Sequence, residues 1–208
     1  MKKILLTGFE PFLSFSLNPT MQIVKELHGK TLNNYVIEGH ILPVDFNKSE
    51  VELVKLLDTV KPDIHISLGL AGGRSKVTPE RIAINVKDGD ADNEGNKPQD
   101  EAIDPNGREG YFSTLPIRAM VDAMNEAGYP ASISNTAGTY LCNNIMYVGR
   151  KYAEEHGGTM PSGFIHIPAS HELAIEHGRI PSWSHQDLVA AIRICLETTV
   201  NFGGMKHD

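Results

Sequence analysis

Residues 35–69, YVIEGHILPVDFNKSEVELVKLLDTVKPDIHISLG, predict a strand, a helix and a second strand in direct succession. The first strand spans 35–42, the second spans 63–69, and Pro62 ends the helix between them. Apolar side chains recur along one face of that helix, at Val51, Val54, Leu57 and Val60. Because a crossover helix joins neighbouring parallel strands, this stretch favours an α/β fold.

The same alternation continues toward both ends of the chain. Further strands are expected over 3–7, 131–136 and 163–167. Further helices are expected from Pro19 to Gly29, over 115–127 and 142–154, and from Ser184 onward, with start signals in Asn18–Pro19 and in the capping box Ser184–Asp187. We therefore expect one domain over 1–208, folded as a three-layer α/β/α sandwich around a mostly parallel, twisted sheet. Ligands of such folds bind beyond the carboxyl ends of the strands, where Gly69 and His166 are expected.

The composition narrows the class of protein. The chain has 208 residues, 40% of them hydrophobic, and a formal net charge of -7. Lys and Arg are not clustered, so a nucleic-acid partner is not expected. The apolar run Ile4–Leu6 is too short for a signal peptide, and no stretch approaches the roughly 20 apolar residues of a membrane span. The two cysteines are expected to be free thiols in the cytoplasm.

The two cysteines have different surroundings. Cys195 shares a predicted helix face with Leu188 and Ile192, so we expect a buried core side chain. Cys142 follows the Gly-containing turn 137–139 at the predicted start of a helix, where the helix dipole and unpaired amides favour a thiolate. Those amides also suit the oxyanion of a tetrahedral intermediate. Cys142 is thus a candidate nucleophile, with a buried structural cysteine as the alternative.

A nucleophilic cysteine needs a base and a group that orients the base, and two residues qualify. His166 lies in the apolar stretch GFIHIP, where it is either a hydrogen-bonded core residue or a catalytic base. A strand over 80–86 would place Glu80 on the apolar face with Ile82, Ile84 and Val86. A buried carboxylate needs a partner, so Glu80 is expected to meet an imidazole, to pair with Arg74 or Arg81, or to be exposed.

Three other kinds of site are not supported by the motifs of the chain: a phosphate-binding loop, a calcium loop and a catalytic metal site. GLAGGR at 69–74 lacks the spacing of a P-loop or a dinucleotide fingerprint, so it predicts only a close backbone approach. Asp88, Asp90 and Asp92 resemble the start of a calcium loop, but Asn93 and Gln99 replace the required Gly and bidentate acid. The sequence contains no H-E-x-x-H or C-x-x-C motif. Neither a metal nor a cofactor is expected.

Ordered motifs along nearly the whole chain resemble the pyroglutamyl peptidase I family, also called pyrrolidone-carboxylate peptidases. They are LLTGFEPF, the pair NP at 18–19, GLAGGR, TPERIAIN, DNEGN, LPI, SNTAGTYLCNN and GFIHIP. The resemblance implies a metal-independent cysteine exopeptidase of the cytoplasm that acts on N-terminally pyroglutamylated peptides and assembles as a homotetramer. It also implies that Cys142, His166 and Glu80 are nucleophile, base and orienting carboxylate.

The resemblance further implies where the pyroglutamyl ring binds. Phe9 and Phe12 of the TGF-x-PF motif would form its aromatic walls, although both fit a core role equally well. The remaining substrate-binding residues are expected to be Leu70, Tyr140 and Leu141. The chain departs from the family at 88–93, where DGDADN replaces a D-A-R-I-P-D-N segment and lacks its arginine. Two other functions therefore stay open, a related cysteine amidase and a weakly active pyroglutamyl-binding protein.

Overall fold

A sheet of six strands, in the order β2-β3-β1-β4-β8-β5, forms the centre of the molecule. A computed structural model describes residues 1–12 and 15–204. The strands of this sheet are β1 Lys2–Phe9, β2 Thr31–Leu32, β3 Tyr35–Leu42, β4 Ile64–Leu70, β5 Thr78–Pro79 and β8 Ser162–Ile167. The four inner strands β3, β1, β4 and β8 are parallel, and the short edge strands β2 and β5 are antiparallel to their neighbours. The predicted mostly parallel sheet is confirmed.

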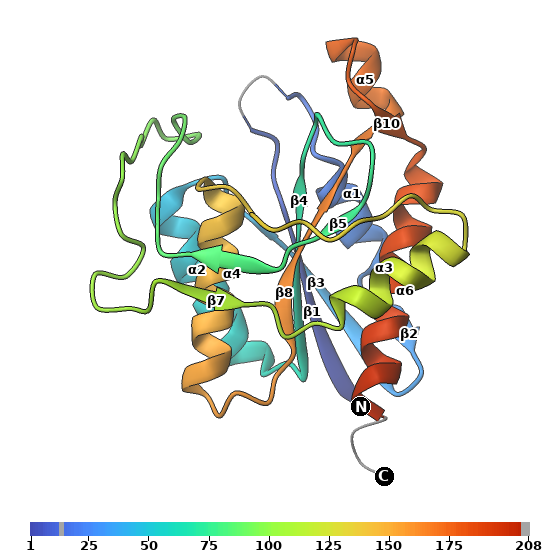
Figure 1. The fold of residues 1–208 in the computed structure, drawn as a ribbon, viewed down its shortest axis with the longest axis horizontal. Helices are drawn as coiled ribbons and strands as arrows, with labels where there is room; N and C mark the ends of the chain where they lie inside the picture. Colours follow the sequence, from blue (N-terminus) through green and yellow to red (C-terminus); the bar gives the residue numbers. More distant parts are fainter. Residues whose placement is uncertain (13–14, 205–208) are drawn as a thin grey trace.

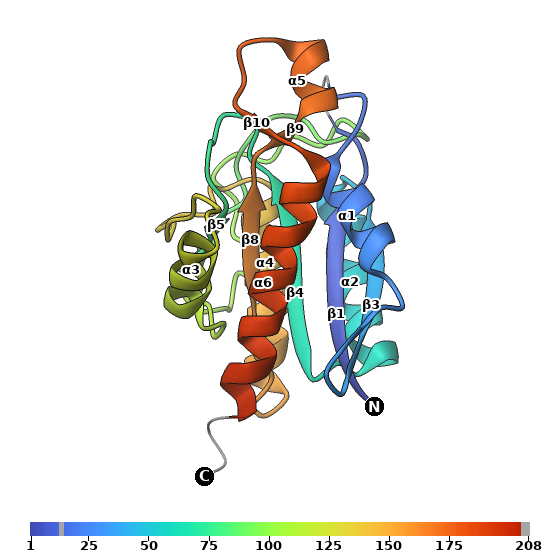
Figure 2. The same cartoon turned by 90° about the vertical axis from the view of Figure 1, so that its right-hand side faces the viewer.

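Helices cover both faces of the sheet, which confirms the α/β sandwich (Figures 1 and 2). The helices are α1 Pro19–Leu27, α2 Phe46–Val60, α3 Ile117–Glu126, α4 Leu141–Glu155, α5 His171–His177 and α6 His185–Gly204. Side chains of α1, α3 and α6 pack in one hydrophobic cluster, and those of α2 and α4 pack in another on the opposite face. Cys195 is fully buried in the first cluster, as predicted.

Local start signals place two of these helices. The Asn18 side chain accepts a hydrogen bond of 3.1 Å from the backbone N–H of Thr20, and Pro19 opens α1. The Ser184 hydroxyl accepts from the N–H of Asp187 at 3.1 Å and donates to its carboxylate at 2.7 Å, so the N-cap half of the predicted capping box is present. Both signals are local, which is why the sequence alone revealed them.

One predicted strand is wrong. Residues 131–136 form only isolated bridges, from Ala131 to Val77 and from Ser134 to Glu80. The strand considered over 80–86 starts after Glu80: β5 ends at Pro79, and β6 Ile82–Ile84 pairs with β7 Gly110–Phe112 in a separate sheet. The parity argument fails with it, because Ala83 is the fully buried residue of β6. Helix α5 and the two-residue strands β9 Ala169–Ser170 and β10 Ser182–Trp183 were not predicted, since they are too short to show a period.

A chain of buried polar side chains crosses the sheet beneath α4. The His65 ring lies 3.0 Å from the hydroxyl of Ser162 on one side and 3.0 Å from that of Ser67 on the other. The Ser67 hydroxyl in turn lies 2.7 Å from that of Thr7. Burial, with a smaller contribution from the charge of Arg150, lowers the pKa of His65 to about 3. His65 is therefore neutral in the folded protein.

This burial predicts a pH-dependent stability. The unfolded histidine titrates near pH ~6.5, so the unfolded state binds an extra proton between that value and the folded pKa of about 3. The free energy of unfolding should fall as pH drops through this window, by at most about 1.4 kcal/mol per pH unit from this group. Urea titrations should show a shallower pH dependence for His65→Asn. If the free energy of unfolding changes with pH by the same slope in wild type and in His65→Asn, the prediction is wrong. His156→Asn, at an exposed histidine, serves as the control.

Candidate active site

Strand β8 and helix α4 bring His166 and Cys142 together at the carboxyl end of the sheet. His166 of β8 pairs with Gly69 of β4 on one side and with Thr78 of β5 on the other. Cys142 is the second residue of α4 and lies over Gly69, where an added Cβ would be 2.9 Å from the Cys142 Sγ. The same Cβ would be 2.6 Å from the Phe164 ring. Gly69 thus leaves the space in which the thiol sits, and the close approach predicted for GLAGGR is confirmed.

Glu80 meets His166 from the loop between β5 and β6. Its side chain is fully buried, and its Oε1 accepts hydrogen bonds of 2.7 Å from His166 Nδ1 and 2.7 Å from Arg74 Nη1. The backbone N–H of Glu80 donates to the Phe164 carbonyl at 2.9 Å, which fixes the loop against β8. Oε2 is also buried, without a hydrogen-bond partner among the described residues. Two donors therefore act on Oε1, and the nearby Ser134 side chain also stabilises the charge of the carboxylate.

The charges of Glu80 and His166 stabilise each other. Burial alone would raise the pKa of the Glu80 carboxyl, but the hydrogen bond and charge of His166, with smaller contributions from neighbouring donors, hold this pKa below its usual value. Burial likewise opposes a charged His166, yet the attraction and hydrogen bond of Cys142, followed by those of Glu80, raise the pKa of His166 to about 9. The arrangement thus favours an imidazolium between a carboxylate and a sulfur, which suits nucleophilic chemistry at the thiol.

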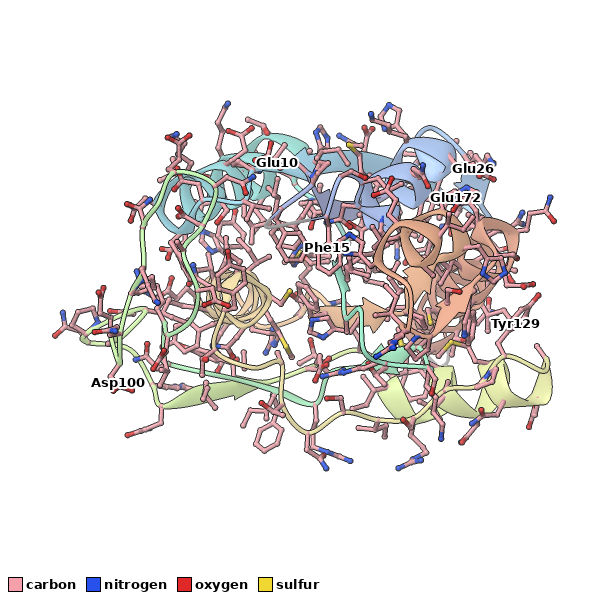
Figure 3. All side chains as sticks on the ribbon, turned by 90° about the horizontal axis from the view of Figure 1, so that it is seen from above. Glu10, Phe15, Glu26, Asp100, Tyr129 and Glu172 are labelled. Carbon is pink, nitrogen blue, oxygen red and sulfur yellow. The ribbon has the colours of Figure 1, made fainter. Side chains whose placement is uncertain are left out.

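A small hollow opens beside Cys142. It measures about 260 Å³ with its mouth, and its lining consists of Phe9, Phe12, Asn18, Val44, Leu70, Tyr140 and Cys142. Of the expected substrate-binding residues, only Leu141 is absent from the lining; its side chain is buried in the hydrophobic cluster under α4. Asn18 and Val44 were not predicted, because a helix cap and an apolar loop residue carry no functional signal. Phe15 packs on Phe12 near the centre of this end of the molecule (Figure 3).

The loop 88–93 packs against the turn that precedes Cys142. Asp88 donates its N–H to the Thr139 carbonyl at 3.0 Å, and the Thr139 hydroxyl donates to the Asp88 carbonyl at 2.9 Å. The Tyr140 hydroxyl donates to the Ala91 carbonyl at 3.3 Å. Tyr140, the residue before α4, makes no side-chain cap, so the first amides of α4 have no partner from that side chain. This loop therefore supports the helix start that carries the thiol.

Two further features of the described chain bear on function. Among residues 1–12 and 15–204, no three His, Cys, Asp or Glu side chains are grouped as ligands of a metal ion. The helices within that part of the chain are all too short or too polar to cross a membrane.

Comparison with known proteins gives one consistent family. The sequence model of the pyroglutamyl peptidase family matches residues 2–202. The chain is 60% identical to the pyrrolidone-carboxylate peptidase of Lysinibacillus sphaericus over 98% of this chain and 99% of that one. It is 53% identical to that of Oceanobacillus iheyensis, over 94% and 98%. The solved pyrrolidone carboxyl peptidase of Thermococcus litoralis superposes with a TM-score of 0.96 at 37% identity, covering 100% and 97%.

The tight space at Gly69 predicts that Gly69→Ala damages the site. The added methyl group must displace the Phe164 ring or the Cys142 sulfur, so we expect a loss of about 1–3 kcal/mol in the free energy of unfolding. We also expect slower alkylation of Cys142 by iodoacetamide, because the sulfur moves away from His166. Gly73→Ala is the matched control, since an added Cβ there meets no atom within 4 Å. Equal alkylation rates in the two variants would contradict this view of Gly69.

Proposed function

Because this chain belongs to the pyroglutamyl peptidase family, we propose that it hydrolyses the amide bond after an N-terminal pyroglutamyl residue. Cys142 is the nucleophile, His166 the base and acid, and Glu80 the orienting carboxylate. The observation that carries this proposal is the 2.7 Å hydrogen bond between His166 Nδ1 and the buried Glu80. It leaves Nε2 as the imidazole nitrogen available to the sulfur.

The first half of the reaction forms a thioester. His166 takes the proton of Cys142, and the thiolate attacks the carbonyl carbon that joins the pyroglutamyl residue to the next residue. The C–N bond then breaks, the acyl group stays on the sulfur, and His166 returns its proton to the leaving amine. Glu80 stabilises the charged imidazole between these two proton transfers.

The second half releases pyroglutamate. A water molecule gives a proton to the now neutral His166 and attacks the thioester carbonyl. The C–S bond breaks, and the sulfur leaves as the thiolate. It takes the proton back from the imidazolium, which restores the thiol and the neutral imidazole from which the reaction began.

The oxyanion of each tetrahedral intermediate needs donors near Cys142. The backbone N–H groups of Leu141 and Cys142 open α4, where the helix dipole also favours negative charge. We assign the oxyanion to these amides, since the loop 88–93 carries no arginine and instead braces the turn before Cys142. Leu141 thus serves through its backbone, while its side chain belongs to the core.

The hollow beside Cys142 suits a small lactam ring. Phe9, Phe12 and Tyr140 supply aromatic walls and Leu70 an aliphatic one, which fit the methylene groups of a pyroglutamyl ring. Its small size favours a small acyl group over a larger one. Such a preference would distinguish a pyroglutamyl peptidase from a general cysteine amidase. The homotetramer and the cytoplasmic location expected from the sequence stay predictions.

The nucleophile can be tested with the two cysteines of the chain. Cys142→Ala should reduce hydrolysis of a fluorogenic pyroglutamyl amide by at least about 10⁴-fold while the thermal unfolding midpoint stays close to that of the wild type. Cys195→Ala, which removes the buried core thiol, should keep the activity of its folded fraction. Wild-type turnover in Cys142→Ala rules out the mechanism. A wild-type protein that binds but does not cleave the amide favours the binding-protein alternative, and equal cleavage of acyclic N-acyl amides favours the amidase.

The pH profile tests the roles of His166 and Glu80. The imidazolium must protonate the leaving amine, so kcat/KM should fall as pH rises through the His166 pKa of about 9. Glu80→Gln removes the negative charge that stabilises the imidazolium, so this basic limb should move to lower pH and kcat should fall. If the basic limb of the pH profile is unchanged in Glu80→Gln, Glu80 does not stabilise the charged form of His166.

A further inference from the structure

Arg74 shares the carboxylate oxygen that orients the histidine. Its Nη1 lies 2.7 Å from Glu80 Oε1, the same atom that accepts from His166 Nδ1 at 2.7 Å. The Glu80 side chain is 0% exposed and that of Arg74 is 33% exposed, so the guanidinium reaches the buried carboxylate from the solvent side. Oε2 has no hydrogen-bond partner among the described residues, so the two hydrogen bonds at Oε1 orient the carboxylate, and the nearby Ser134 side chain also helps to lower its pKa.

Arg74 is itself held by its neighbours. Its backbone N–H donates to the Ala71 carbonyl at 2.9 Å in the turn after β4. Its Nη1 also donates to the Thr78 hydroxyl, and Thr78 lies directly opposite His166 in the register of β5 and β8. Nη2 reaches the Thr136 carbonyl at 3.4 Å. The planar guanidinium of Arg74 thus connects Thr78, the neighbour of His166 in the sheet, with the carboxylate of Glu80. That carboxylate in turn orients His166.

We propose that Arg74 is a positioning residue, which holds Glu80 Oε1 toward His166 and balances part of the carboxylate's charge. Arg74 does not line the hollow beside Cys142, so it acts through Glu80 and not on the substrate. This inference rests on the proposed function, because the reaction it supports is the Cys142-dependent hydrolysis. The charged or titratable groups that face the imidazole are Cys142 from α4, Glu80 from the β5–β6 loop and Arg74 behind it.

Two substitutions of Arg74 separate position from charge. Arg74→Gln removes both the hydrogen bonds that position Glu80 and the positive charge of the guanidinium. We therefore expect kcat to fall by about 100-fold, the cost of a misplaced catalytic group, with KM nearly unchanged. Its basic limb should move to higher pH, because a positive charge near the imidazolium is lost. Arg74→Lys keeps the charge but cannot bridge Thr78 and Glu80 with one planar group. It should leave the basic limb in place and recover kcat only in part.

Arg81, the residue after Glu80, supplies the matched control. Its Nε donates to Asn135 Oδ1 at 2.7 Å and makes no bond to Glu80, so Arg81→Gln makes the same change of charge one residue from Glu80. It should keep both kcat and the basic limb. Thermal unfolding of each variant reports on folding independently of activity.

The outcomes are distinct. A kcat of Arg74→Gln that equals that of Arg81→Gln overturns the proposal. A lower kcat with an unmoved basic limb in Arg74→Gln also overturns it, because a merely structural arginine would give that result. If the wild type shows no Cys142-dependent pyroglutamyl hydrolysis, the proposed function fails first and Arg74 has no reaction to support.

Discussion

Glu80 carries a negative charge where water does not reach, and the donors on its Oε1, His166 and Arg74, stabilise it there. This requirement links three parts of the chain. The turn after β4 positions Arg74, β8 positions His166, and the loop after β5 positions Glu80 itself. Removing any one member leaves a buried group without its partner, which is costly in free energy. The chemistry proposed for Cys142 therefore depends on a pairing that the fold also needs.

The parallel sheet explains why these groups meet at one end. The inner strands all run the same way, so β4 and β8 both end at the face seen from above in Figure 3. Helix α4 begins at that face and places the Cys142 sulfur over Gly69, between the two strand ends. The Phe164 ring lies on the same side of Gly69 as the sulfur and next to the His166 ring, so the sulfur is confined beside His166. Packing, and not a flexible loop, thus sets the distance between thiol and imidazole.

The sequence predicted the parts of this arrangement that depend on local signals. Periodicity and caps located α1, α4 and the inner strands, and the surroundings of Cys142 and His166 singled out two residues that the fold brings together. Glu80 was singled out by an argument from strand parity that the structure does not support, since the strand breaks at Glu80 and Arg81. Glu80 is buried against β8, which is distant in the sequence, and against Arg74 in the turn after β4. Such pairings leave no period in the chain, so only the motif resemblance indicated that Glu80 orients His166.

The proposed mechanism requires that Cys142 carries the acyl group during turnover. Rapid acid quenching of the enzyme with a pyroglutamyl amide, followed by mass mapping of its peptides, tests this directly. A pyroglutamyl adduct should appear on the peptide that contains Cys142, form in the first turnover and disappear as pyroglutamate is released. An adduct on another side chain, or steady turnover with Cys142 unmodified at every quench time, would rule out Cys142 as the nucleophile.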